Sequence, residues 1–278
     1  MKNIKKILAL VFAALMLIVI AACASPAQPP PGPDNGNGNG NGEVALTIEP
    51  GILHMGTSAD FPPYEFWEGG EIVGIDPEIA AAIAEKLGLE LVITDIDFDA
   101  LIPSLIENRF DIVMAALTFT EERAEVVNFS ISYATGVQAI IVPEDSPITS
   151  VDDLFAEGAF HYIGVQLSTT GDFLSTWDLG DAGLASIERF ARGTDAVMAL
   201  LADQVDLVII DNAPAQSFVD ANPGLRVLET HFAVEDYAIA LNINNVALLE
   251  RVNEALAALI ADGTVQRIID YYIPPSGE

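Results

Sequence analysis

A short segment, residues 118–123, combines a hydroxyl group, a helix start and an arginine. Its sequence Thr-Phe-Thr-Glu-Glu-Arg follows the apolar run 112–117, which predicts a buried strand that ends at Thr118 and a helical turn that carries Arg123. Such a turn directs free backbone N–H groups and a guanidinium at one point, which suits a carboxylate. We expect an anion site formed by Leu117, Thr118 and Arg123. The alternative is a surface ion pair between Arg123 and a neighbouring glutamate, which would contribute about 0–1 kcal/mol.

Positive charge is scarce in this chain, which makes Arg123 conspicuous. The 278 residues include 11 Lys+Arg against 41 Asp+Glu, a formal net charge of −30. Three of the cations are Lys2, Lys5 and Lys6, so the rest of the chain has only Lys86 and seven arginines. Nucleic acid and anionic membrane surfaces repel so acidic a protein, and we expect no nucleic-acid partner.

Other polar and aromatic side chains follow predicted strands, where ligands bind in open parallel sheets. Asp211 ends an apolar run at 205–210. The other candidates are Ser58, Phe61, Phe98, Ala116, Thr169 and Thr170. Taken singly, these residues have ordinary explanations: core packing for the aromatics, and helix capping for the threonines and for Asp211. Together, a guanidinium, an isolated acid and aromatic walls describe a pocket for an α-amino acid, since each buried ligand charge needs a counter-charge.

Signatures of catalysis and of metal binding are missing from the sequence. There is no Gly-x-Ser-x-Gly elbow, no phosphate-binding Gly-x-x-x-x-Gly-Lys loop and no His-Glu-x-x-His helix. The three histidines, His54, His161 and His231, are far apart and adjoin apolar strands. We expect no catalytic residue, no metal ion and no cofactor.

Strands and helices alternate along the chain, which predicts an α/β fold with a parallel sheet. Strands at 53–57, 89–93 and 111–117 enclose two helices. The first helix is predicted to begin with Asp76 as its N-cap and Pro77 at its first position, and Gly88 ends it. Further strands are expected at 137–142, 162–166, 205–210 and 237–242, and further helices near 148–154, 169–176, 196–201, 249–260 and 265–272.

The N-terminus has the pattern of an export signal. Basic residues precede the apolar run 7–20, and small residues lead to Cys23, the only cysteine in the chain. The stretch is nearly long enough for a transmembrane anchor, which is the alternative. Residues 20–23, Ile-Ala-Ala-Cys, resemble a bacterial lipobox, which implies a signal peptide at 1–22 and a lipid on Cys23. Residues 23–43, rich in proline and then in Asn-Gly repeats, are expected to form a linker.

Several motifs together resemble the extracellular solute-binding proteins of polar amino acid ABC transporters, bacterial solute-binding protein family 3. The similarity covers residues 53–273. The motifs are Gly-Thr-Ser-Ala-Asp-Phe-Pro-Pro-Tyr-Glu-Phe (56–66), Gly-Ile-Asp-Pro-Glu-Ile-Ala (74–80), Asp-Phe-Asp-Ala-Leu-Ile-Pro-Ser-Leu (97–105), residues 118–123 with 127–130, Ile-Gly-Val-Gln (163–166) with Thr-Thr-Gly (169–171), and residues 205–211.

The resemblance implies a periplasmic-binding-protein-like (type II) Venus flytrap, in which two hinge strands join two α/β lobes and a ligand closes them. Residues 44–132 and 234–278 would form lobe 1, and residues 133–233 lobe 2. It also implies roles for the site residues. Arg123 would hold the α-carboxylate with Thr118, Thr169 and Thr170, Asp211 would take the α-ammonium with the Ala116 carbonyl, and Phe61 and Phe98 would enclose the side chain, with Ser58 near its tip.

The implied function is capture of an α-amino acid and its delivery to the permease and ATPase subunits of an ABC transporter. The protein would be a monomer outside the cytoplasm, held at the cell membrane by the lipid on Cys23. Many relatives have aspartate at the position of Ser58, and its replacement weighs against lysine or arginine as ligand. The alternatives are an enzyme on the same fold, of the cyclohexadienyl or arogenate dehydratase type, and a component of a ligand-sensing receptor.

Overall fold

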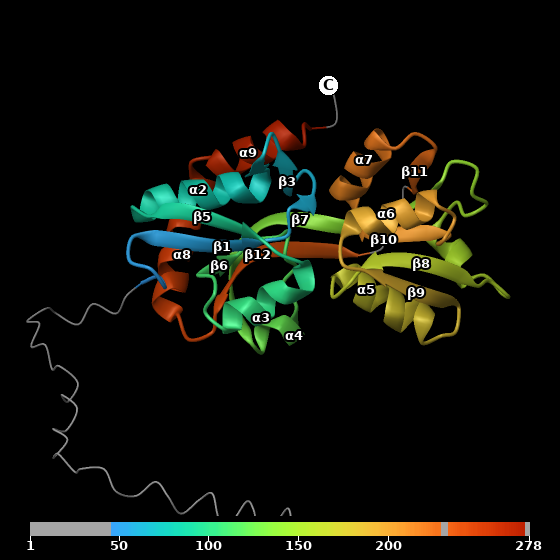
Figure 1. Ribbon diagram of the computed structural model, residues 1–278, viewed down its shortest axis with the longest axis horizontal. Coiled ribbons are helices and arrows are strands. Elements are labelled where there is room, and N and C mark those ends of the chain that lie inside the picture. The colour runs from blue at the N-terminus through green and yellow to red at the C-terminus, as the bar shows by residue number, and fades with distance from the viewer. Residues whose placement is uncertain (1–45, 229–232, 276–278) are drawn as a thin grey trace, which may run out of the picture. The chain divides into compact units, whose positions relative to one another are not determined.

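The computed structural model describes residues 46–228 and 233–275 (Figure 1). The predicted signal peptide, the linker and the lipidation site Cys23 lie outside these residues. Residues 44–278 form one compact unit. Within the described ranges, no helix has the length and apolar character needed to cross a membrane.

A nine-stranded mixed sheet organises the described residues. Its order is β5-β1-β6-β12-β7-β10-β8-β9, and β11 also pairs with β7. β1 is parallel to β5 and β6, β8 is parallel to β9 and β10, and β7 and β12 are antiparallel to their partners. The strands are β1 (Ile52–Thr57), β5 (Glu90–Asp95), β6 (Ile112–Val113), β7 (Val127–Pro143), β8 (His161–Gln166), β9 (Ala185–Phe190), β10 (Leu207–Asp211), β11 (Leu225–Leu228) and β12 (Val234–Asn242).

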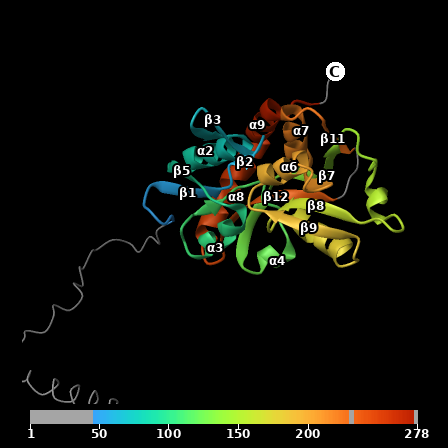
Figure 2. The same ribbon diagram turned by 45° about the vertical axis from the view of Figure 1, so that its right-hand side comes forward.

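Helices cover both faces of this sheet, as an α/β fold requires. The α-helices are α2 (Ile75–Leu87), α3 (Leu101–Ile106), α4 (Glu121–Ala124), α5 (Thr170–Ser175), α6 (Gly193–Leu201), α7 (Asn212–Ala221), α8 (Val246–Ala261) and α9 (Thr264–Tyr272), with short helices η1 (Phe98–Ala100), η2 (Val151–Phe155) and η3 (Thr176–Gly180). α2 and α9 lie on one face of the β5-β1-β6 part and α3 on the other (Figures 1 and 2). The α/β fold class and the parallel order of the first strands are confirmed.

Two long strands, β7 and β12, connect two α/β lobes. β7 pairs with β12 along residues 127–137 and with β10 and β11 along residues 138–143, so the same strand belongs to both parts of the sheet. Lobe 1 contains β5, β1 and β6, and lobe 2 contains β10, β8 and β9. This is the expected two-lobed flytrap with two hinge strands. Its exact boundaries, at residues 132/133 and 233/234, stay a prediction.

Three local predictions differ from the structure. The strand predicted at 137–142 is only the last third of β7. Residues 127–136 were not predicted as strand because they include polar and exposed side chains and form no apolar run. A small three-stranded sheet, formed by β2 (Asp60–Phe61), β3 (Glu65–Glu68) and β4 (Glu71–Val73), was not predicted. Asp76 is not an N-cap: Gly74 occupies that position, and Asp76 lies in the first turn, fully buried.

Glycine at position 74 has a steric reason. Its φ is 130°, a left-handed backbone angle that side chains rarely adopt, and a Cβ there would lie 2.2 Å from the carbonyl oxygen of Tyr64. The N-cap is thus two residues earlier than the Asp-Pro pattern predicts. As a result the Asp76 carboxylate points into the protein, where it accepts hydrogen bonds from the Ala116 N–H and the Tyr133 hydroxyl, both at 2.8 Å.

Candidate functional site

Arg123 is held as the motif predicts, in a turn that begins after Thr120. The Thr120 hydroxyl caps α4 by accepting the Arg123 N–H at 3.1 Å. The Arg123 guanidinium donates to the Thr118 carbonyl at 2.7 Å and to the Ser168 carbonyl, in lobe 2, at 3.0 Å. Only 8% of Arg123 is exposed, and its side chain makes no ion pair with any carboxylate of the described residues. The surface ion-pair interpretation is therefore wrong.

The backbone at residues 114–118 bends where β6 ends. β6 ends at Val113, and Ala116 has a left-handed φ of 45°, which turns the chain out of the strand predicted to reach Leu117. Asp76 holds this bend through the Ala116 N–H. Leu117 is buried in a core cluster with Leu101 and does not line the cavity between the lobes.

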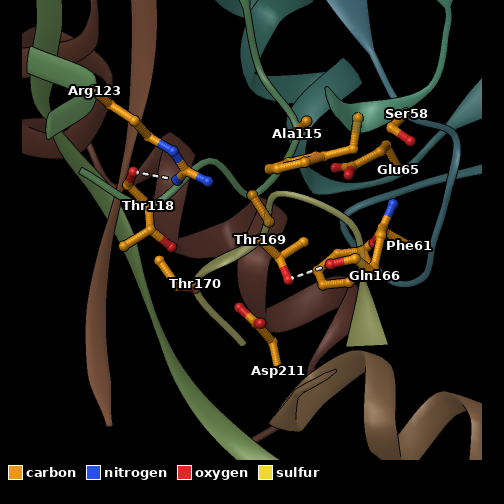
Figure 3. A pocket seen from close by; sticks show the side chains of 12 residues that line it. Ser58, Phe61, Glu65, Ala115, Thr118, Arg123, Gln166, Thr169, Thr170 and Asp211 are labelled. Carbon is orange, nitrogen blue, oxygen red and sulfur yellow. Dashed lines mark hydrogen bonds between the residues drawn. The ribbon is translucent and has the colours of Figure 1, made fainter. Parts of the chain in front are cut away.

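One cavity brings together nine of the ten predicted ligand-binding residues. Its lining comes from both lobes and consists of Ser58, Phe61, Glu65, Phe98, Ala115, Ala116, Thr118, Arg123, Gln166, Thr169, Thr170 and Asp211 (Figure 3). Glu65, Ala115 and Gln166 were not among the candidates, and Leu117 is the candidate that is missing. The structure shows which residues line the cavity. That any of them binds a ligand stays a prediction.

Asp211 ends β10 and lies at the N-cap position of α7, but its side chain makes no capping hydrogen bond. Instead, the carboxylate accepts hydrogen bonds from the Tyr237 hydroxyl and from the Gln138 side-chain amide, which come from the two hinge strands. The capping explanation of Asp211 is wrong. Burial and the nearby Glu235 raise the pKa of Asp211 to about 7, although bonds from Tyr237 and Gln138 and the charge of Arg123 oppose the shift.

Thr169 and Thr170 start α5 and also face the cavity. The Thr169 hydroxyl caps the helix by accepting the Asp172 N–H at 3.2 Å, and it donates to the Gln166 carbonyl at 2.8 Å. The Thr170 hydroxyl accepts a hydrogen bond from Gln138 at 3.4 Å. The helix-cap explanation is thus confirmed for Thr169, and the cap places both threonines on the wall of the cavity.

Glu65 is a cavity residue that the sequence reasoning missed. It is the first residue of β3, only 1% of it is exposed, and its carboxyl group faces the buried carboxyl group of Asp76. Burial, followed by the charge of Asp76, raises its pKa well above the ordinary value. The sequence offered one indication of Glu65: a charged residue is unusual directly after Pro-Pro-Tyr, in a segment that follows a strand end.

Charge is unbalanced around the cavity, in favour of acids. Arg123 is the one buried arginine among the described residues, and burial lowers its pKa to about 10, against the opposing effect of Glu235 and Asp211. Two buried carboxyl groups, those of Glu65 and Asp211, line the same cavity. The cavity wall thus has one cation, Arg123, and two carboxyl groups, Glu65 and Asp211, whose pKa values burial raises.

Comparison with known proteins agrees with this architecture. Residues 53–275 match the bacterial extracellular solute-binding proteins, family 3. The chain is 32% identical to the Arginine-binding extracellular protein ArtP of Bacillus subtilis, over 78% of this chain and 84% of that protein. It is 31% identical to ABC transporter arginine-binding protein 1 of Escherichia coli, over 80% of this chain and 90% of that protein.

A solved structure gives the same result at the level of the fold. An ancestral arginine-binding protein bound to arginine superposes with a TM-score of 0.75 and 37% identity, over 80% of this chain and 98% of that chain. The family match spans both lobes and the two hinge strands. This chain therefore belongs to the bacterial extracellular solute-binding proteins, family 3.

Proposed function

We propose that the cavity binds an α-amino acid, with its carboxylate at Arg123 and its ammonium at Asp211. The supporting observation is that Arg123 and Asp211 approach the cavity from different sides (Figure 3). Arg123 offers a charged donor on a desolvated wall, and Asp211 offers an acceptor that is already oriented by Tyr237 and Gln138. A zwitterion satisfies both groups, whereas a plain anion or a plain cation would leave one of them unpaired.

The ligand's side chain is proposed to carry a positive charge, with arginine as the best-supported choice. Glu65 and Ser58 lie together on the side of the cavity away from Arg123 (Figure 3). Serine at position 58 weighs against a cationic side chain, but Glu65 supplies an acid in the same pocket. The aromatic rings of Phe61 and Phe98 line the cavity as well, and such faces suit a flat guanidinium.

A pair of nearly isosteric ligands tests this assignment. L-Citrulline has the shape of L-arginine but a neutral end group, so it keeps every proposed contact except the charge at Glu65. We expect the wild-type protein to bind arginine about 10- to 100-fold more tightly than citrulline, as typical for a charge-assisted hydrogen bond. In Glu65→Gln this preference should fall to within about threefold, measured by isothermal titration calorimetry.

Glu71→Gln is the matched control, because Glu71 is an exposed glutamate of the same small sheet. It should leave the arginine–citrulline ratio unchanged. If wild-type protein binds the two ligands equally, or if Glu65→Gln retains the full preference, the proposed cationic side chain is wrong. If neither ligand nor any other standard amino acid binds, the α-amino acid assignment itself fails.

We further propose that the mature protein is a lipid-anchored monomer that delivers its ligand to the membrane subunits of an ABC transporter. The support is the lipobox-like sequence at 20–23 and the family's extracellular role. A sensing role needs a further partner, and no observation favours a reaction in the cavity, so neither alternative is proposed.

The anchor has a direct test in the mass of the mature chain. Expressed at full length in a bacterial host, the protein should begin at Cys23, carry acyl chains and partition into detergent. Cys23→Ser should lack the lipid, while Ala24→Ser, its neighbour, should behave as wild type. An unmodified chain that still begins at Met1 would instead support the transmembrane-anchor alternative.

A further inference from the structure

A second set of contacts joins the lobes outside the cavity, and it centres on Arg192. Arg192 precedes α6 in lobe 2, and its guanidinium reaches three aspartates of lobe 1. Its Nη1 atom lies 3.0 Å from Asp95 Oδ1 and 3.7 Å from Asp60 Oδ1, and its Nε atom lies 3.1 Å from Asp97 Oδ1. Three carboxylates from two strand ends thus converge on a single cation of the opposite lobe.

Asp60 also caps α6 from the other lobe. The N-cap residue of α6 is Arg192, which provides no capping hydrogen bond from its side chain. The Asp60 Oδ2 atom supplies the missing acceptor, 3.5 Å from the Thr194 N–H and 3.3 Å from the Thr194 hydroxyl. A carboxylate at a helix N-terminus stabilises the helix both by hydrogen bonding and through the helix dipole.

These residues are separate from the cavity, because none of Arg192, Thr194, Asp60, Asp95 and Asp97 lines it. They also differ from an ordinary surface pair. The Arg192 side chain is only 25% exposed, and those of Asp60 and Asp95 are 11% and 18% exposed, whereas that of Asp97 is 52% exposed. Charge-assisted hydrogen bonds at such partly buried positions are stronger than exposed pairs.

Hinge opening would break every one of these contacts at once. β7 and β12 connect the lobes, while Arg192 and Asp60 lie on elements that only meet when the lobes do. Opening would leave three aspartates of lobe 1 without their cation and α6 without its cap. The contacts therefore favour the closed arrangement over the open one, whatever occupies the cavity.

We propose that Arg192, with Asp60, Asp95 and Asp97, is an interlobe latch that determines ligand affinity without touching the ligand. The proposal rests on the proposed function only in that a ligand binds between closed lobes. A contact present only in the closed state raises affinity by the factor by which it shifts the open–closed equilibrium. Its loss should act mainly on the dissociation rate, since a ligand leaves when the lobes part.

The first test compares Arg192→Gln with Arg189→Gln in the mature chain carrying Cys23→Ser. Arg189 is the matched control because its partner, Asp172 at 2.8 Å, belongs to the same lobe. With L-arginine as the probe, Arg192→Gln should raise Kd about 5- to 50-fold, mostly through faster dissociation in stopped-flow measurements, and Arg189→Gln should stay within about twofold of wild type. Equal effects of the two variants would overturn the latch.

A mutant cycle separates the latch from a general loss of fold. Arg192 Nε is the only side-chain partner of Asp97 among the described residues. Asp97→Asn alone should weaken binding of arginine several-fold, yet it should add little in the Arg192→Gln background. Additive effects of the two substitutions would show that the pair does not act as a unit and would contradict the proposal.

Interlobe distance gives a readout that needs no ligand. Spin labels at Glu85→Cys and Ala202→Cys, exposed positions in the two lobes, should show a larger share of long distances in Arg192→Gln than in Arg189→Gln. This comparison holds even if arginine proves not to be the ligand, so failure of the proposed function and failure of the latch can be told apart. Identical distance distributions in the two ligand-free variants would contradict the proposed latch.

Discussion

Arg123→Gln is expected to abolish ligand binding at any practical concentration while leaving the protein folded. Removal of one partner of a buried, hydrogen-bonded charge pair costs about 2–5 kcal/mol or more, which corresponds to about 30- to 5000-fold in Kd. The effect should lie at the upper end here, because the ligand carboxylate would be desolvated against Phe98 and main-chain carbonyls that repel it. Titration calorimetry with L-arginine measures the loss, and far-ultraviolet circular dichroism checks the fold.

Arg226→Gln is the matched control for this prediction. Arg226 also donates its guanidinium hydrogens to main-chain carbonyls, those of Glu144, Ser146 and Ile148, but it lies away from the cavity. Its substitution should reduce the melting temperature at most and leave Kd within about twofold. Retained affinity in Arg123→Gln would show that the carboxylate binds elsewhere and would contradict the proposed orientation of the ligand.

Local sequence was enough to predict the turn that carries Arg123. The two glutamates and the preceding apolar run are all within a few residues of Arg123, and the structure has the predicted helical turn, which Thr120 caps. The first parallel strands were equally clear, since 53–57 and 89–93 are short segments with apolar residues that flank a helical pattern. Where the deciding interactions are local, pattern and structure agree.

Residues whose role depends on tertiary contacts were missed. Gln138 and Glu235 lie on different hinge strands, 97 positions apart in the sequence, and they meet only through the pairing of β7 with β12. Asp76 has the sequence pattern of a helix cap, yet the close approach of Gly74 to Tyr64 moves the helix start and buries the carboxylate. Hydrophobic periodicity cannot reveal such contacts. It indicates which face of a helix or strand a residue is on, but not which residues of other elements pack against that face.

The acid cluster around Asp211 should make ligand binding depend on pH near neutrality. Burial and Glu235 raise the pKa of Asp211 to about 7. The groups that face it are Arg123, Glu235, Tyr237 and Gln138. A ligand ammonium needs the ionised carboxylate, so the empty protein must release a proton before it binds well. Affinity should therefore rise as pH increases to about 7 and then level off. For one proton, the rise is at most about tenfold per pH unit.

Without ligand, the contribution of Asp211 to the free energy of unfolding should fall over the pH range in which affinity rises. The folded pKa of about 7 lies above the ordinary aspartate value of 3.8, so between these values the folded state holds a proton that the unfolded state has lost. The contribution of Asp211 to the free energy of unfolding is thus greatest below about pH 4 and declines as pH rises to about 7. Above that pH, Asp211 carries a buried negative charge that Tyr237, Gln138 and Arg123 offset only in part.

Asp211→Asn should accordingly separate function from stability. At pH 8 we expect the variant to lose arginine binding by a factor of about 100 or more, while the ligand-free protein becomes more stable by about 1–3 kcal/mol. The asparagine keeps an acceptor for Gln138, and its amide can donate to the Tyr237 hydroxyl, so the neutral side chain fits the existing partners. Chemical denaturation from pH 5 to 8 should show a stability gain that grows with pH. A variant that is destabilised at pH 8, or that still binds arginine tightly, would mean that Asp211 is held ionised by the protein itself. In that case its charge would not be the one that the ligand ammonium compensates.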